Sequence, residues 1–196
     1  PHVQFRAEDE IHAVQIQFHS RHVDVSVRAI VEQNRLATQT ETPTFSGMPP
    51  SILIVVRRGE DPAKCTVRPL RGTPGLEFMP YPLRHKPDLS RHLLLAPEAP
   101  PLTAADAGRP LLLLDASWRH AAKMRKAVEP VEARSIPPGW TTAYPRRSKT
   151  HEDPDAGLAT VEALFAALCT LGFRDDSLLR FYPWRDAFLD LNRDRI

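Results

Sequence analysis

The chain has 196 residues, of which 42% are apolar and 26% charged, a balance typical of a globular domain rather than of a disordered or fibrous chain. No run approaches the roughly 20 apolar residues that a membrane span needs. The two cysteines lie far apart, and the histidines and cysteines show no zinc-ligand spacing. We therefore expect a reduced, cytoplasmic protein without a metal or a membrane segment.

The formal net charge is only +2, but the basic residues gather in three clusters. Such clusters favour a polyanionic partner. Solvated surface stretches give the same pattern, because runs of charge usually face water. The clusters contain Arg57, Arg58, Lys64, Arg68 and Arg71; Arg119, Lys123, Arg125 and Lys126; and Arg146, Arg147 and Lys149.

Residues 1–47 differ in character from the rest of the chain. Apolar residues alternate with polar ones there in short stretches, and a polar linker from Thr38 to Gly47 follows. Met48 then precedes two prolines and an apolar run. We expect Met48 to be the natural initiator and residues 1–47 to be an extension.

Beyond residue 50, short apolar runs alternate with helical patterns, which indicates an α/β domain. Strands are predicted at 52–56, 92–96 and 111–114, and the four leucines of the third are typical of a buried parallel strand. Residues 140–144 form a further candidate strand. Little regular helix is expected in the proline-rich stretch 74–101.

Three helices are predicted in the second half of the chain. The first runs from Trp118 to Lys126 and has Ser117 as its cap. The second covers Thr160 to Leu171, with one apolar face and Gly172 following. The last begins at about Trp184 and places Trp184, Phe188 and Leu191 on one face. Earlier in the chain, Thr103 to Asp106 resembles a capping box that opens a brief helical turn.

Polar groups stand at the edges of apolar elements at three places, where α/β proteins hold ligands. Asp115 and Trp118 end a buried strand and suit an ammonium group, a proton or a sulfonium, although a helix cap beside a core tryptophan gives the same pattern. The loop from Asp61 to Thr66 offers N–H groups and a hydroxyl, or is a surface turn. Residues 157–163 open a helix whose free N–H groups favour a ligand, unless Glu162 simply completes the cap.

Aromatic residues at helical spacing usually belong to the core. Core packing is therefore the expected role of Trp140, Tyr144, Trp184 and Phe188.

Six stretches, in this order, resemble motifs of the S-adenosylmethionine-dependent aminocarboxypropyltransferases that modify small-subunit ribosomal RNA. Asp61 to Thr66 resembles D-P-K-K-C-[ST], and Asp115 to Trp118 resembles D-C-S-W. Leu158 to Ala163 resembles L-S-x-V-E-A. The other matches are Thr103 to Asp106, Arg134 to Pro145, and Phe181 to Arg193.

The chain departs from the family pattern at several positions. Ala116 replaces the cysteine of D-C-S-W, which excludes a nucleophilic cysteine there. Tyr144 replaces an asparagine, and Ala159 replaces the serine of L-S-x-V-E-A. Arg146 to Lys149 replace a V-N-Y-G stretch.

The resemblance implies a SPOUT-like knotted α/β domain with a small N-terminal lobe. Residues 48–110 would form the lobe and first strands, and residues 111–196 the knotted core that binds S-adenosyl-L-methionine. The implied activity moves the 3-amino-3-carboxypropyl group of that donor to N3 of a uridine or pseudouridine derivative in small-subunit rRNA.

The resemblance also implies roles for individual residues. Asp115 would be catalytic. The donor would be bound by Thr66, Asp115, Trp118, Leu158, Ala159 and Thr160. RNA would be bound by Arg57, Arg58, Lys64, Arg119, Lys123, Arg146 and Arg147.

Three alternatives share much of this pattern. The DTW-domain family, which places the same group on a tRNA uridine, is similar through Asp115 to Trp118 and Ala122 to Met124, whereas Trp184 to Arg193 favours the ribosomal family. A ribosome-assembly factor that binds RNA without catalysis would have lost donor binding. A SPOUT methyltransferase would release S-adenosylhomocysteine.

Overall fold

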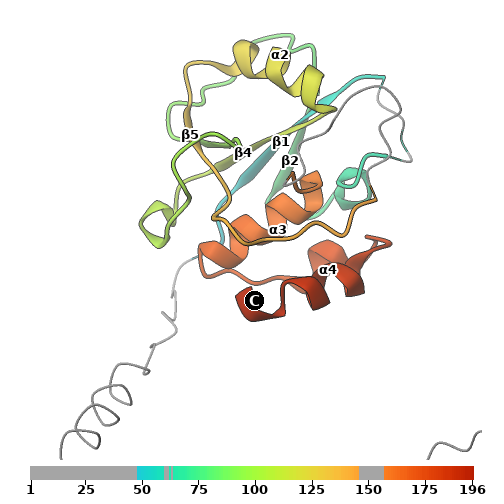
Figure 1. Cartoon of the computed structure of the whole chain (residues 1–196). Helices are drawn as coiled ribbons and strands as arrows, with labels where there is room; N and C mark the ends of the chain where they lie inside the picture. Colours follow the sequence, from blue (N-terminus) through green and yellow to red (C-terminus); the bar gives the residue numbers. More distant parts are fainter. Residues whose placement is uncertain (1–47, 60–61, 63, 146–156) are drawn as a thin grey trace, which may run out of the picture. The chain divides into compact units, whose positions relative to one another are not determined.

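The computed structural model describes residues 48–59, 62, 64–145 and 157–196 (Figure 1). The predicted extension at residues 1–47 lies outside the described residues, and so do Arg146, Arg147 and Lys149. In the described part of the chain, no helix has the length and apolar character to cross a membrane.

In the part of the chain that the structure describes, five parallel strands form one sheet in the order β2-β1-β4-β3-β5. The predicted strands at 52–56, 92–96 and 111–114 are confirmed, and the predicted α/β class is correct. The two edge strands were not predicted, because one of them contains Pro80 and the other is short and polar. An edge strand accepts proline because one side of its backbone has no partner strand. The strands are β1 (Ile52–Arg57), β2 (Leu76–Tyr81), β3 (Leu93–Leu95), β4 (Leu111–Asp115) and β5 (Glu132–Arg134).

The predicted strand at residues 140–144 is wrong, since the backbone there is not paired with another strand. Side chains bind it instead. The Thr141 N–H donates to Asn192 Oδ1 at 2.8 Å, and the Ala143 N–H donates to Glu162 Oε1 at 2.8 Å. The apolar pattern of this segment therefore reflects packing against the core rather than membership of the sheet.

The helices are α2 (Trp118–Val128), α3 (Thr160–Thr170) and α4 (Arg185–Leu191), which confirms the three predicted helices. Two details differ from the prediction. Ser117 precedes α2, but its hydroxyl lies 2.7 Å from His120 Nδ1 and makes no capping bond to the backbone. Leu191 is 55% exposed, because α4 ends there and only Phe188 turns fully into the core.

Helices cover both faces of the sheet, as Figure 1 shows, with α2 on one side and α3 and α4 on the other. Successive residues of β1 point to opposite faces, so Leu53 and Val55 pack towards the face that α2 covers. Ile52 and Ile54 pack with the residues of α3. Both faces of the central strands are therefore buried, which explains their continuous apolar sequences.

The predicted turn at Thr103 to Asp106 is a short 3-10 helix. The Thr103 N–H donates to Asp106 Oδ2 at 3.0 Å, which confirms the capping interaction. The Arg134 guanidinium, at the end of β5, also contacts this carboxylate at 3.1 Å. The ion pair attaches the 3-10 helix to the edge of the sheet.

Candidate active site

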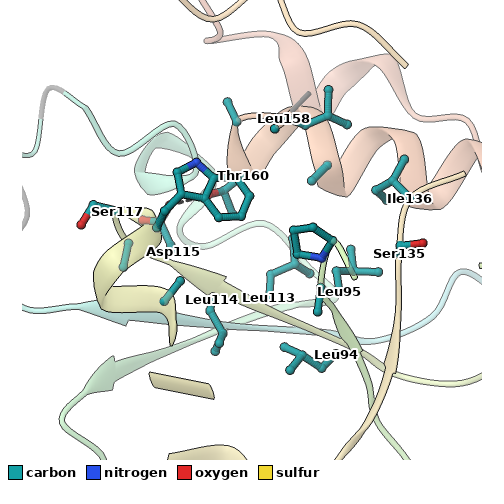
Figure 2. Close-up of a pocket in the computed structure, with 18 of the residues that line it drawn as sticks. Leu94, Leu95, Leu113, Leu114, Asp115, Ser117, Ser135, Ile136, Leu158 and Thr160 are labelled. Carbon is teal, nitrogen blue, oxygen red and sulfur yellow. Dashed lines mark hydrogen bonds between the residues drawn. The ribbon is translucent and has the colours of Figure 1, made fainter. Parts of the chain in front are cut away.

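A pocket of about 1200 Å³ opens at the carboxyl edge of the sheet (Figure 2). Its walls come from the ends of β3 and β4, the loops that follow β1 and β5, and the first turns of α2 and α3. Because the strands are parallel, these ends meet on one side, where doubly wound α/β proteins bind ligands. The pocket is large enough for a nucleoside with an amino-acid side arm.

Asp115 is the last residue of β4 and lies in the pocket wall, only 6% exposed. The Cys65 thiol donates to its Oδ2 at 2.8 Å, and the Thr160 hydroxyl donates to its Oδ1 at 2.8 Å. Three segments that are far apart in sequence therefore fix the orientation of one carboxylate. Each carboxylate oxygen can accept a second hydrogen bond from a ligand.

Cys65 was not assigned a role from the sequence, although it belongs to a quoted motif. Burial raises the pKa of its thiol to about 12, and the neighbouring Asp115 charge and hydrogen bond contribute to the increase. The group is therefore a protonated hydrogen-bond donor rather than a nucleophile. Its place after β1 and opposite the end of β4 could not be deduced without the strand order.

Both cysteines are expected to alkylate slowly in the folded protein. The pKa of Cys169 is also raised by burial, to about 11. At pH 8, a pKa raised by about three units lowers the thiolate fraction of Cys65 about a thousandfold. The thiol favours the folded state below the ordinary pKa near 9, and this stabilisation is lost as the pH rises towards 12.

Mass spectrometry after iodoacetamide treatment, with and without denaturant, measures this protection residue by residue. We expect folded Cys65 to label at least about a hundredfold more slowly than unfolded Cys65 at pH 8. A Cys65→Ala variant isolates the signal of Cys169. Equal labelling rates of Cys65 in the folded and unfolded chain would contradict a partly buried, protonated thiol.

Thr66 connects the loop after β1 to the start of α3. Its hydroxyl oxygen accepts the Val161 N–H at 3.2 Å, so its proton is available to donate into the pocket. Leu158, Ala159 and Thr160 form the neighbouring wall, at the helix terminus whose N–H groups and dipole favour anionic ligand atoms. The family resemblance implied that six residues bind S-adenosyl-L-methionine. All six line this pocket: Thr66, Asp115, Trp118, Leu158, Ala159 and Thr160.

Trp118 begins α2 and lines the same pocket with Ala121 and Ala122. It is partly exposed and does not belong to either core cluster, so the alternative of a core tryptophan is wrong. Trp140 and Tyr144, by contrast, pack against the core as predicted. Both also line the pocket, and the stretch that contains Tyr144 is one that the family resemblance implied to lie close to the donor or the RNA.

The described basic residues of the first two clusters are divided between the pocket lining and positions outside it. Lys64 lines it, as do Arg125 and Lys126 of α2. Arg57, Arg58, Arg119 and Lys123 lie outside its lining, and Arg119 and Lys123 are exposed on α2. Among the described residues, no group of three or more His, Cys, Asp or Glu side chains can hold a metal ion.

A parallel α/β sheet with a buried carboxylate, an indole and a helix N-terminus around one pocket defines a class of small-molecule-binding α/β proteins. No protein-family model matches the chain. A solved structure described as the SAM-dependent rRNA:acp-transferase Tsr3 from Vulcanisaeta distributa is similar, with a TM-score of 0.57 and 28% sequence identity. The similarity covers 75% of this chain and 80% of that chain.

Two curated relatives are both named 16S rRNA aminocarboxypropyltransferase. Those from Vulcanisaeta distributa and Methanopyrus kandleri are 34% identical over 100 and 90 residues, or 47% and 45% of this chain. The matches cover 52% and 51% of the relatives, so the chain spans about half their length. The predicted resemblance to the rRNA aminocarboxypropyltransferases is confirmed in sequence and in fold.

Proposed function

We propose that the protein transfers the 3-amino-3-carboxypropyl group of S-adenosyl-L-methionine to N3 of a uridine or pseudouridine derivative in small-subunit rRNA. The observation that carries the proposal is the meeting of three motif segments around Asp115, at 2.8 Å from Cys65 and from Thr160. Relatives named for 16S rRNA support a ribosomal substrate over a tRNA substrate.

The residues of the pocket suit the amino-acid end of this donor. Asp115 provides a buried carboxylate for the ammonium group, which favours a charge-assisted hydrogen bond. The Thr66 hydroxyl, whose oxygen accepts the Val161 N–H, has a proton to donate to the carboxylate group, and the dipole at the start of α3 favours a negative charge there. The ammonium group of the ligand would thus face the Asp115 carboxylate, and its carboxylate group would face the Thr66 hydroxyl.

The remaining walls suit the sulfonium and the adenosine. Trp118 offers an aromatic face to the cationic sulfur, and the backbone of Leu158 to Thr160 offers hydrogen bonds to the adenosine. Leu94, Leu95 and Leu113 add apolar surface to the pocket (Figure 2). A methyltransferase binds the same donor. Whether the methyl or the carboxypropyl group is transferred therefore depends on which carbon attached to the sulfur these walls leave open to the nucleophile.

The proposed reaction forms a bond between N3 and the donor carbon attached to sulfur, breaks the carbon–sulfur bond, and releases neutral methylthioadenosine while the N3 proton passes to solvent. Asp115 contributes by fixing the amino-acid end, because its two oxygens are already oriented by Cys65 and Thr160. Catalysis by this site is therefore mainly positioning.

Donor labelled in its carboxypropyl carbons, incubated with the protein and host rRNA that lacks the modification, tests the proposal. Label in the RNA with release of methylthioadenosine is the expected result, and digestion then names the nucleotide. Release of S-adenosylhomocysteine would identify a methyltransferase instead. RNA binding without donor binding or transfer would identify an assembly factor.

We also propose that the chain forms the knotted SPOUT arrangement, with residues 48–110 as the lobe and first strands and residues 111–196 as the knotted core. The path of the chain supports this. After β5 at one edge of the sheet, the chain returns to its middle, where the Val161 N–H reaches Thr66 in the loop after β1.

RNA is expected to contact the basic side chains around the pocket. Replacing both Arg119 and Lys123 with alanine should weaken rRNA binding and reduce the slope of log affinity against log salt by about 0.7 to 0.9 for each phosphate that is no longer neutralised. Binding measured at several salt concentrations gives both numbers. The other proposed contacts are Arg57, Arg58, Lys64, Arg146 and Arg147.

The matched control replaces Arg185 and Arg193 with alanine. These cations lie on and just after α4, which covers the other face of the sheet from α2 (Figure 1). The control should keep the salt slope of the unmodified protein. An equal reduction in both double variants would place the RNA elsewhere.

A further inference from the structure

Glu162 is a fully buried carboxylate whose four hydrogen bonds exceed the needs of a helix cap. Its Oε2 accepts the Ala159 N–H at 2.8 Å and the Thr142 hydroxyl at 2.6 Å. Its Oε1 accepts the Ala143 N–H and the Tyr182 hydroxyl, both at 2.8 Å. Among the described residues none of these donors is a cation, so neutral hydrogen bonds offset the cost of burying the charge.

The donors belong to three segments, two of which form the pocket wall. Ala159 lines the pocket directly. The Thr142 hydroxyl, which donates to Glu162, accepts the Tyr144 N–H at 3.1 Å, and Tyr144 also lines the pocket. Glu162 therefore connects two parts of the wall, at Tyr144 and at Ala159, that residues 146–156 separate in the sequence.

Aromatic contacts close this set of bonds into a ring. The Tyr144 ring meets Trp184 edge to face at 5.2 Å between centroids, and Trp184 meets Tyr182 in the same manner at 5.6 Å. The Tyr182 hydroxyl then returns to Glu162. Each member is thus held from two sides, and the C-terminal segment takes part in shaping the pocket.

A second buried side chain supports the same segment one residue earlier. Asn192, 2% exposed, exchanges hydrogen bonds with the Thr141 backbone at 2.8 and 2.9 Å. It also donates to the Phe188 carbonyl at 2.7 Å, which attaches it to α4. Residues 141–144, which have no partner strand, therefore keep one conformation through side-chain contacts.

We propose that Glu162 is a positioning residue that holds the Tyr144 and Ala159 walls in the shape that binds the donor. The identity of the bound donor, S-adenosyl-L-methionine, rests on the proposed function. A positioning role affects donor affinity more than turnover, because the wall is restored when donor is saturating. Glu162→Gln keeps the size of the side chain but replaces one carboxylate oxygen with an NH₂ group. This group would face two N–H or O–H donors and could accept neither hydrogen bond.

Three variants test this role. Glu162→Gln is expected to raise the Kd and KM for S-adenosyl-L-methionine at least tenfold, with kcat at saturating donor within about threefold of the unmodified protein. Tyr182→Phe removes one of the four hydrogen bonds to Glu162 and should raise the Kd for S-adenosyl-L-methionine less than Glu162→Gln does. Leu178→Ala, in the same core but outside the pocket lining, is the control. It should lower the melting temperature and leave Kd unchanged.

Calorimetric Kd, melting temperature and amide exchange of Ala143 and Ala159 are measured on all three. A Kd for Glu162→Gln equal to that of the unmodified protein, with a melting temperature lowered as in Leu178→Ala, would overturn the positioning role. If the unmodified protein binds no donor, the proposed function fails instead. Exchange then decides the positioning role: selectively faster exchange of both amides in Glu162→Gln supports it, and unchanged exchange overturns it.

Discussion

Replacing Asp115 with asparagine is expected to lower aminocarboxypropyl transfer at least about a hundredfold while the fold is retained. The change removes the charge that would face the donor ammonium, and hydrogen bonds to charged groups contribute about 1.5 to 3 kcal/mol. It also places an NH₂ group beside the Cys65 thiol or the Thr160 hydroxyl, both of which donate to the carboxylate. The two losses act on the same step and together correspond to about 3 kcal/mol or more.

Donor binding by calorimetry and label transfer to rRNA measure the two parts of this effect. Asp106→Asn is the matched control, because Asp106 is also 6% exposed, bonds to Thr103 and Arg134, and does not line the pocket. We expect the control to melt at a lower temperature with an unchanged donor Kd. Unaltered binding and transfer by Asp115→Asn would remove Asp115 from the site.

The central elements of the fold could be predicted because their sequences carry strong local patterns. Four leucines at 111–114 and the apolar run at 52–56 indicated buried parallel strands. The apolar face of Thr160 to Leu171, with Gly172 after it, indicated a helix end, and Gly172 has the positive φ of 84° that favours glycine. These signals lie within about a dozen residues and do not depend on the rest of the chain.

The errors lie where distant residues decide the conformation. β2 contains Pro80 and β5 has the polar sequence Glu132–Arg134, so neither resembles a strand, and each pairs only because a neighbouring strand provides partners. Residues 140–144 resemble a strand but bind to Glu162 and Asn192. Contacts between residues that lie about 20 to 50 positions apart leave no local pattern in the sequence.

The same distinction separates the predicted from the missed site residues. Asp115, Trp118 and Thr160 stand at the ends of apolar elements, and parallel strands bring such ends together. Cys65 and Glu162 belong to quoted motifs, but their roles follow only from partners 50 and 20 residues away in sequence. Glu162 stands in the first turn of a predicted helix, where a carboxylate is equally typical of a cap.

Replacing Trp118 with alanine should weaken donor binding about a hundredfold. The indole would contribute contact area and an interaction of its face with the sulfonium, which is worth about 2 kcal/mol when desolvated. Alanine favours helix at the first residue of α2, so the loss is not expected to come from unfolding of that helix. Calorimetry is the suitable measurement, since the variant removes a fluorophore.

Trp118→Phe distinguishes an aromatic contact from mere filling of space. A phenyl ring keeps part of the face, so an affinity between those of the unmodified protein and Trp118→Ala is expected, whereas Trp118→Leu should resemble alanine. Unchanged affinity in all three variants would show that Trp118 does not contact the sulfonium, and that contact would then be sought at another aromatic residue of the lining. Trp140 is then the first residue to replace, because its ring lines the same pocket while it stacks on Phe188 at 6.0 Å.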